Sequence, residues 1–96
     1  MHVAIRTYYG KGTKKLFDAG EQHQAELQRL MRTVEGLVSY TLARDGNGGY
    51  SVTICREKRA LRQSRKKALE FLTQHAPGNN LAAMHIYEGK VIAHVQ

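Results

Sequence analysis

Four side chains with possible acid–base or anion-binding chemistry lie at predicted inner positions of this chain: His23, Tyr40, Arg6 and Tyr8. An imidazole can act as a general base or hold a polar group of a ligand. A Tyr hydroxyl covered by a helix needs a hydrogen-bond partner, and a buried guanidinium needs an acid or an anionic ligand. We therefore take His23 and Tyr40 as candidate catalytic residues, and Arg6 and Tyr8 as candidate substrate-binding residues.

Each of these four residues also has a purely structural interpretation. The imidazole of His23 could be bonded to a backbone carbonyl or a Tyr hydroxyl at the edge of the core. Both tyrosines could serve packing alone. The guanidinium of Arg6 could form a salt bridge with an acidic side chain, including one from a second copy of the chain.

Strand-like segments occupy residues 2–9, 37–44 and 50–56, and a last one lies within 82–95. The sequence DGNGG at 45–49 predicts a tight hairpin, because Asp, Asn and Gly tolerate positive φ. We expect residues 88–90 to interrupt the last strand as a bulge or hairpin tip.

Alternation along the strands assigns the candidate residues to faces. Arg6 and Tyr8 share one face of the first strand with Ala4, and Tyr40 shares one face of the second strand with Val38 and Leu42. On the opposite face of the second strand we expect the remaining alternate residues: Leu37, Ser39, Thr41 and Ala43.

Two amphipathic helices are predicted. In chain order, one lies between the first and second strands and the other between the third and fourth. Thr13 can cap the first, whose apolar stripe runs through Gly20 and His23 to about Val34. The glycine suggests close packing on the sheet or room for a ligand, and Gly36 ends the helix in the left-handed conformation. The second helix is expected from Lys58 or Arg59 to His75, followed by a loop at 77–80.

This order of elements, βαββαβ, predicts an α+β fold of the ferredoxin-like kind over residues 1–96 as one domain. Right-handed crossovers then give a four-stranded antiparallel sheet with strands one and three in the middle and both helices on one face. The open face mixes apolar and hydroxyl residues, so we expect a second copy of the chain to cover it in a homodimer.

The composition limits the class of protein. The 96 residues contain no apolar run long enough to span a bilayer and no recognisable signal peptide, so we expect no membrane association and a cytoplasmic location. The only cysteine, Cys55, is predicted to be a buried strand residue. The net charge is +7. The basic residues between 56 and 67 indicate either the solvent-exposed side of a helix or a surface that binds an anionic partner.

No metal site is predicted from spacing along the chain. Histidines 2, 85 and 94 form no zinc signature, and no two histidines stand four apart on a helix. Residues 10–13 likewise lack the spacing of a phosphate-binding loop.

The turn that leads into the second strand carries a resemblance to a known family. Gly36, Ser39 and Tyr40 match the Pro-Gly-x-x-Ser-Tyr turn of antibiotic biosynthesis monooxygenase-like proteins, with Glu35 in place of the usual Pro. The resemblance implies a dimeric α/β barrel, in which two sheets pack together with helices outside and small-molecule pockets lie between sheet and helices. Some members oxidise aromatic substrates without metal or flavin, so we expect no cofactor. The chain has no Trp, which departs from the Asn, Trp and His set of catalytic members.

Three functions remain open at this point. The first is a protein that binds a small molecule, or a cofactor-independent monooxygenase that oxidises one. The aromatic or anionic compound would lie in a pocket lined by His23, Tyr40 and Arg6. The second is a structural or regulatory dimer without catalysis. The third is an RNA-binding module, which shares the order of elements but displays two or three stacking aromatics where residues 49–54 offer only Tyr50. We therefore do not expect nucleic acid as the partner.

Overall fold

A computed structural model of the chain describes residues 1–76 and 85–96. Its four strands are β1 (His2–Tyr8), β2 (Leu37–Asp45), β3 (Gly48–Cys55) and β4 (His85–Lys90). They form one antiparallel sheet in the order β2-β3-β1-β4, which confirms the predicted topology with strands one and three in the middle. The loop predicted at 77–80 and the start of the last predicted strand, at 82–84, lie outside the described residues.

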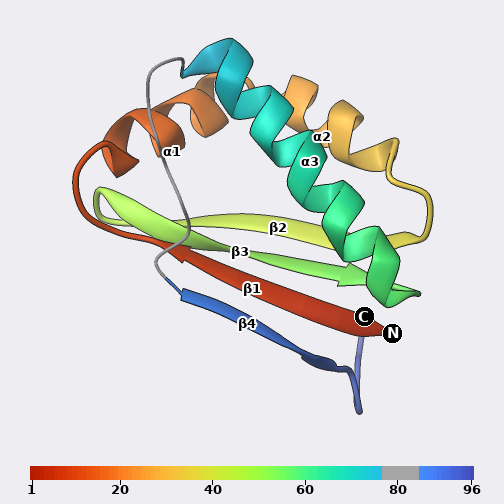
Figure 1. The fold of residues 1–96 in the computed structure, drawn as a ribbon. Helices are drawn as coiled ribbons and strands as arrows, with labels where there is room; N and C mark the ends of the chain where they lie inside the picture. Colours follow the sequence, from red (N-terminus) through yellow and green to blue (C-terminus); the bar gives the residue numbers. More distant parts are fainter. Residues whose placement is uncertain (77–84) are drawn as a thin grey trace.

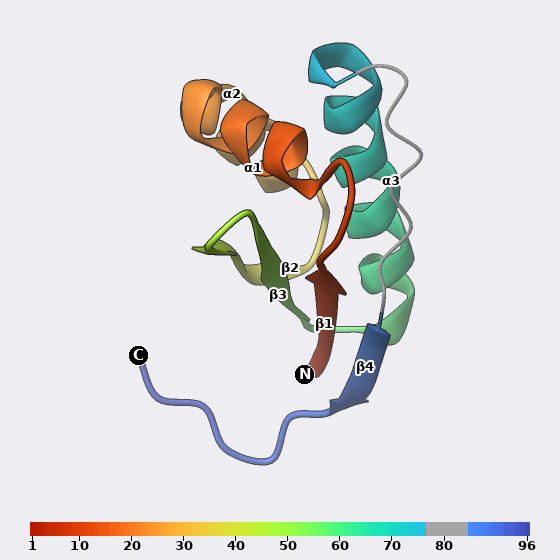
Figure 2. The same ribbon diagram turned by 90° about the vertical axis from the view of Figure 1, so that its left-hand side faces the viewer.

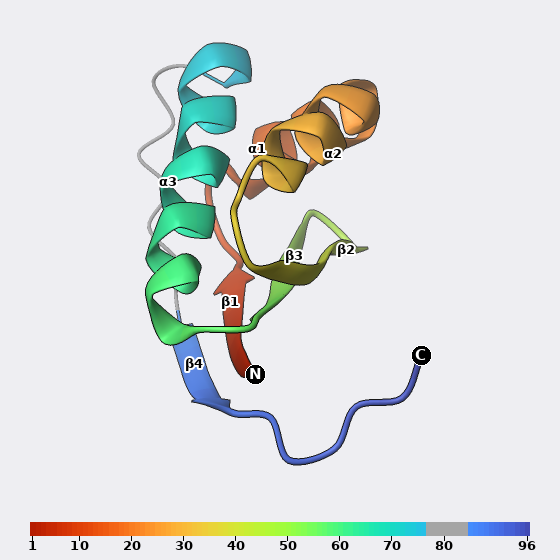
Figure 3. The same ribbon diagram turned by 90° about the vertical axis from the view of Figure 1, so that its right-hand side faces the viewer.

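Three helices cover one face of this sheet (Figure 1). They are α1 (Thr13–Gln22), α2 (Gln24–Arg32) and α3 (Lys58–His75). Figures 2 and 3 show the opposite face without any helix. This α+β arrangement is the ferredoxin-like fold that the order of patterns predicted. None of the helices in the described part of the chain has the length and apolar character needed to cross a membrane.

The predicted single helix over residues 13–34 is wrong in two respects. The chain leaves helical geometry at His23 (φ −121°, ψ 37°), so two shorter helices replace one, and the second ends at Arg32. Backbone hydrogen bonds from His23 N to Ala19 O and from Leu27 N to His23 O, both 3.0 Å, bridge the break. Leu16 and Phe17 of α1 and Leu27 and Met31 of α2 are buried, so the apolar side continues beyond the break. Thr13 is not the cap either, because its Oγ1 donates to Gly10 O at 2.8 Å from inside the first turn.

The hairpin between β2 and β3 turns at Gly46, whose φ of 62° is the left-handed conformation that the glycine-rich turn predicted. At the other end of β2, a bulge between Leu37 and Ser39 shifts the pairing register. Leu37 consequently faces the helices with Cys55 and packs on the core, which corrects its predicted place on the open face.

The last strand also differs from its prediction. β4 runs without interruption from His85 to Lys90, and Gly89 pairs with Val3 in the ladder to β1. Backbone pairing with a central strand overrides the local signal of the glycine, because Gly89 has open space around it and nothing there forces a bulge.

The hydrophobic core lies between the sheet and the helices. It includes Ala4 and Cys55 from the sheet, Met31 from α2, and Leu61 and Phe71 from α3. Cys55 is fully buried, as predicted for a small strand residue, and burial raises the pKa of its thiol. The inner side of α3 also buries Ser64. Leu69 of the same helix is exposed.

Candidate functional site

A row of three adjoining cavities lies between the helices and the sheet, and Tyr40 lines all three. Tyr40 projects from the helix-facing side of β2, since it pairs with the fully buried Thr53. The widest of the three cavities, about 270 Å³, opens at the β2 edge between this strand and helices α1 and α2. Apolar and aromatic side chains form much of its wall: Phe17, Leu27, Tyr40 and Leu42.

The innermost cavity, about 30 Å³, lies under α3 and has a different chemical character. Among the described residues its wall holds two guanidinium groups, two phenols and two serine hydroxyls, but no carboxylate. These are Arg6 and Arg65, Tyr8 and Tyr40, and Ser51 and Ser64. A narrow apolar space of about 20 Å³ adjoins both neighbours, sharing Leu27 and Leu42 with the outer cavity and Tyr8 and Leu72 with the inner one.

Arg6 contributes an uncompensated charge to the inner cavity. Its side chain comes from central strand β1, and the residue is only 6% exposed. Its Nη2 donates a long hydrogen bond of 3.5 Å to Leu61 O, and within residues 1–76 and 85–96 its Nε has no partner. The salt bridge considered for Arg6 is not found among those residues. A buried guanidinium without an acid favours an anion or water beside it.

The two phenols of the site are held in their neutral form. Burial raises the pKa of Tyr40 well above its usual range, and the nearby Tyr8 adds to this shift while Arg6 opposes it. Burial also raises the pKa of Tyr8, against the opposing charges of Arg6 and Arg65 and a hydrogen bond with Ser51. At neutral pH both side chains therefore carry a proton that they can donate in a hydrogen bond.

A second arginine, Arg44, lines the outer cavity but differs from Arg6 in having acidic partners. Its Nη1 lies 2.9 Å from Asp18 Oδ1 and 3.0 Å from Glu21 Oε1, both on α1. Hydrogen bonds from Lys14 and Arg44 lower the pKa of Asp18. Acidic side chains thus already neutralise the positive charge at the outer end of the row, whereas the described part of the chain supplies no acid for Arg6 at the inner end.

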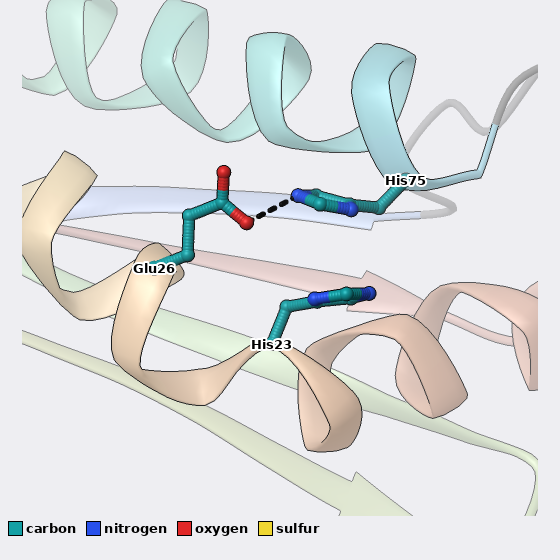
Figure 4. Close-up of side chains that lie close together, drawn as sticks. All are labelled: His23, Glu26 and His75. Atoms are coloured by element: carbon teal, nitrogen blue, oxygen red, sulfur yellow. Dashed lines mark ion pairs between the residues drawn. The ribbon is translucent and has the colours of Figure 1, made fainter.

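The structure does not bring His23 to these cavities. Its side chain points from the α1–α2 junction towards α3, as Figure 4 shows, and its ring stacks on that of His75 with the centroids 3.9 Å apart. The ring of Phe71 is T-shaped to that of His23, with the centroids 6.4 Å apart. The expectation that His23 faces the sheet beside Tyr40 and Arg6 is therefore wrong, and its catalytic role stays a prediction.

Three of the four candidate residues, Arg6, Tyr8 and Tyr40, do meet at one site. The sequence analysis did not identify Arg65 of α3, which belongs to the wall of the inner cavity although the residue as a whole is exposed. Its charge opposes the raised pKa of Tyr8, so the long side chain brings that charge near the cavity, an effect that helical periodicity does not capture.

The fold resembles those of several solved structures. MupZ from Pseudomonas fluorescens superposes with a TM-score of 0.66 at 13% identity over 91% of this chain, which spans 65% of the MupZ chain. A Chloroflexus aurantiacus protein assigned as an antibiotic biosynthesis monooxygenase gives 0.66 at 14% identity, covering 99% of this chain and 96% of its own. The monooxygenase ActVA-Orf6 of Streptomyces coelicolor, in complex with nanaomycin D, gives 0.60 at 19% identity, covering 99% and 90%.

No protein-family model matches the sequence, and no curated protein matches it. Identities of this size establish similarity of fold alone. The structural resemblance predicted from Gly36, Ser39 and Tyr40 is confirmed at that level: this chain folds like the antibiotic biosynthesis monooxygenase-like proteins.

Proposed function

We propose that this protein binds a small aromatic anion in the row of cavities that meet at Tyr40. The apolar part of the ligand packs on Phe17, Leu27 and Leu42 in the outer cavity. Its negative group receives a hydrogen bond from Tyr40 and lies towards Arg6 and Tyr8. The outer cavity, about 270 Å³, is just below the roughly 300 Å³ at which ligand pockets usually begin, so the ligand has one or two rings.

The single observation that carries this proposal is that Arg6 Nε has no partner among residues 1–76 and 85–96, although Arg6 is almost fully buried. Two cationic side chains and two protonated phenols surround a space whose described wall contains no carboxylate. Such a wall attracts negative charge and repels cations. The ligand of ActVA-Orf6, a protein of the same fold, is a small molecule, which agrees with a ligand-binding role.

We further propose that the protein acts as a homodimer joined through the open face of the sheet. Register aligns Tyr87, Ile5, Val52 and Thr41 in one row across the four strands on that face. Tyr87 is 58% exposed, and Ile92 and Val95, in the segment that follows β4, are each 94% exposed. That segment runs on the side of the sheet away from the helices (Figures 2 and 3). A second copy of the chain would cover these apolar groups. We propose a cytoplasmic location for this dimer.

Binding is tested with a matched pair of probes, 1-hydroxy-2-naphthoate and its neutral amide, by isothermal titration calorimetry. We expect the carboxylate to bind more tightly than the amide. Arg6→Met should weaken carboxylate binding at least about tenfold, which corresponds to about 1.4 kcal/mol, and leave amide binding unchanged. Arg62→Met, on the exposed side of α3, is the control and should behave as wild type.

Equal affinities for the two probes, or an Arg6→Met variant that still prefers the carboxylate, would contradict the proposed anion site. A protein that binds neither probe but remains a stable dimer would instead support the structural or regulatory role. Salt-dependent binding of a short RNA, abolished by charge reversal on α3, would favour the nucleic-acid alternative.

Oxidation of the bound molecule is a second candidate function, favoured by the fold shared with the monooxygenase ActVA-Orf6. The test is oxygen consumption with a compound that binds. If His23 or Tyr40 is catalytic, His23→Ala or Tyr40→Phe should abolish turnover while the compound still binds. Unchanged turnover would remove the substituted residue from the catalytic set.

A further inference from the structure

Three side chains of types that can bind a metal ion converge where the α1–α2 junction meets the end of α3 (Figure 4). His23 lies at the break between the helices, Glu26 in the first turn of α2, and His75 at the last residue of α3. One donor atom from each residue can be chosen so that all three lie within 4.8 Å of one another. None of the three residues lines the cavities that meet at Tyr40, so this cluster is separate from the proposed anion site.

The contact between His75 and Glu26 leaves a ring nitrogen unsatisfied. His75 Nε2 lies 2.5 Å from Glu26 Oε2, an ion pair when the imidazole is protonated, but the nitrogen makes no hydrogen bond within the described residues. Within the described residues this buried nitrogen has no other partner. A positive charge between the nitrogen and the carboxylate would satisfy both. A proton can supply that charge, and so can a metal ion.

We propose that His23, Glu26 and His75 bind one divalent transition-metal ion of the zinc class. Two imidazoles and one carboxylate are a ligand set that zinc uses where a further position is left to water. All three residues are only partly buried, but His75 Nε2 itself is covered, so an ion can reach that nitrogen only after the rings move. The bound ion would clamp the start of α2 to the end of α3.

Binding requires a small rearrangement of the two rings. Ligands about 2.1 Å from a tetrahedral zinc ion are roughly 3.4 Å apart, whereas His75 Nε2 and Glu26 Oε2 are 2.5 Å apart and the three donor atoms lie within 4.8 Å of one another. The planes of the His23 and His75 rings differ by only 24°, so their nitrogen lone pairs do not converge on a single point. Rotation about the side-chain bonds would separate the stack and direct one nitrogen of each ring at the ion.

This geometry also explains why spacing along the chain predicted no metal site. His23 and Glu26 are close in sequence but form no known signature, and His75 comes from the far end of another helix. Only the packing of α2 on α3 unites them.

The test uses untagged protein, stripped with a chelator and dialysed, and titrated with Co²⁺ and Zn²⁺. We expect one ion per chain with micromolar or tighter affinity, and visible Co²⁺ absorption bands typical of four or five ligands. Glu26→Gln and His75→Ala should each weaken binding at least about tenfold, and His23→Ala should do the same. His85→Ala, which removes an exposed imidazole of β4 outside the cluster, is the control and should bind as wild type.

Folding of each variant is checked by circular dichroism, and Glu26→Gln keeps the size of the side chain it replaces. Zn²⁺ should raise the Tm of the wild type and of His85→Ala but not that of Glu26→Gln, because an ion that binds only the folded state stabilises it. Absence of saturable binding would overturn the proposal, as would binding that Glu26→Gln and His75→Ala leave unchanged. Neither result bears on the anion site, which is assayed with the naphthoate probes on metal-free protein.

Discussion

Leu42 of β2 packs directly against the backbone of α1 at Gly20: a Cβ at this glycine would lie 3.1 Å from Leu42 Cδ2. The glycine thus allows α1 to approach the sheet closely, and both residues also line the outer cavity. Both sequence-based interpretations of Gly20 therefore hold: the glycine packs closely on the sheet, and it also lines a space that could hold a ligand.

Replacing Gly20 with Ala should stabilise the fold and shrink the site. Ala is favoured over Gly in a helix by about 1 kcal/mol. Part of that gain is offset, because the new methyl group pushes the end of Leu42 into the neighbouring cavity. We expect urea denaturation to show a net gain of about 0.5 kcal/mol and calorimetry to show weaker naphthoate binding. Lower stability with unchanged binding would mean that Leu42 cannot move into the cavity.

The same substitution at Gly49 should have the opposite effect on stability. A Cβ there would collide with the backbone oxygen of Ala43 and lie 2.8 Å from Cε1 and Cζ of Phe17. Backbone and a buried ring cannot give way as the end of a leucine can, so we expect Gly49→Ala to cost about 2 kcal/mol or more. Gly20→Ala, measured in the same denaturation experiment, is the matched comparison. Equal effects of the two substitutions would contradict this packing.

Local signals in the sequence were strong enough to predict the order of elements and the sheet topology. The hairpin is the clearest case, since the turn needs positive φ and Gly46 supplies it. Alternation along β1 and β2 also placed Arg6, Tyr8 and Tyr40 on the helix-facing side, and these three meet at one site. Hydrophobic periodicity and the residue preferences of turns are local properties, so a single sequence is enough to recognise them.

The features that the sequence did not predict depend on contacts between distant segments. No proline marks the break at His23, whose ring stacks on that of His75 from a helix much later in the chain. Pairing with Val3 keeps Gly89 within β4, and a bulge moves Leu37 into the core. In each case a tertiary contact overrides the local pattern, which no spacing rule along one chain can capture.

Removing the charge of Arg6 should stabilise the ligand-free protein. Its guanidinium is buried, and its Nε has no partner among the described residues, so the folded state bears an uncompensated desolvation cost. Arg6→Met keeps the length of the side chain without the charge, and we expect about 1 kcal/mol or more of added stability in urea denaturation. Arg62→Met should change stability by less than about 0.5 kcal/mol, as is usual for exposed positions. A loss of stability in Arg6→Met would show that an anion, water or a partner already compensates the charge.

A single charged substitution on the open face should separate the proposed dimer. Val52 lies between Ile5 and Thr41 in the row across the sheet, and its side chain is only half buried in one copy. Val52→Glu would bury a carboxylate in the interface, which is costly without a partner. Light scattering after size exclusion should give twice the 10.8 kDa chain mass for wild type and the single mass for the variant. Arg62→Glu, on the helical side, should remain a dimer, and a wild type of single mass at micromolar concentration would contradict the proposed assembly.

Alkaline unfolding should report the burial of Tyr40. Burial raises the pKa of its hydroxyl in the folded protein above the ordinary value of 10.0. The unfolded chain therefore loses this proton first, so the contribution of Tyr40 to stability is complete below pH 10 and declines as the pH rises above 10 towards the folded pKa. Urea denaturation between pH 8 and pH 11 should show a smaller loss of stability in Tyr40→Phe than in wild type. Tyr87→Phe, which alters a ring that is 58% exposed, should follow the wild type. If wild type and Tyr40→Phe lose stability in parallel, the Tyr40 hydroxyl is open to solvent and cannot be the buried donor that the proposed anion site requires.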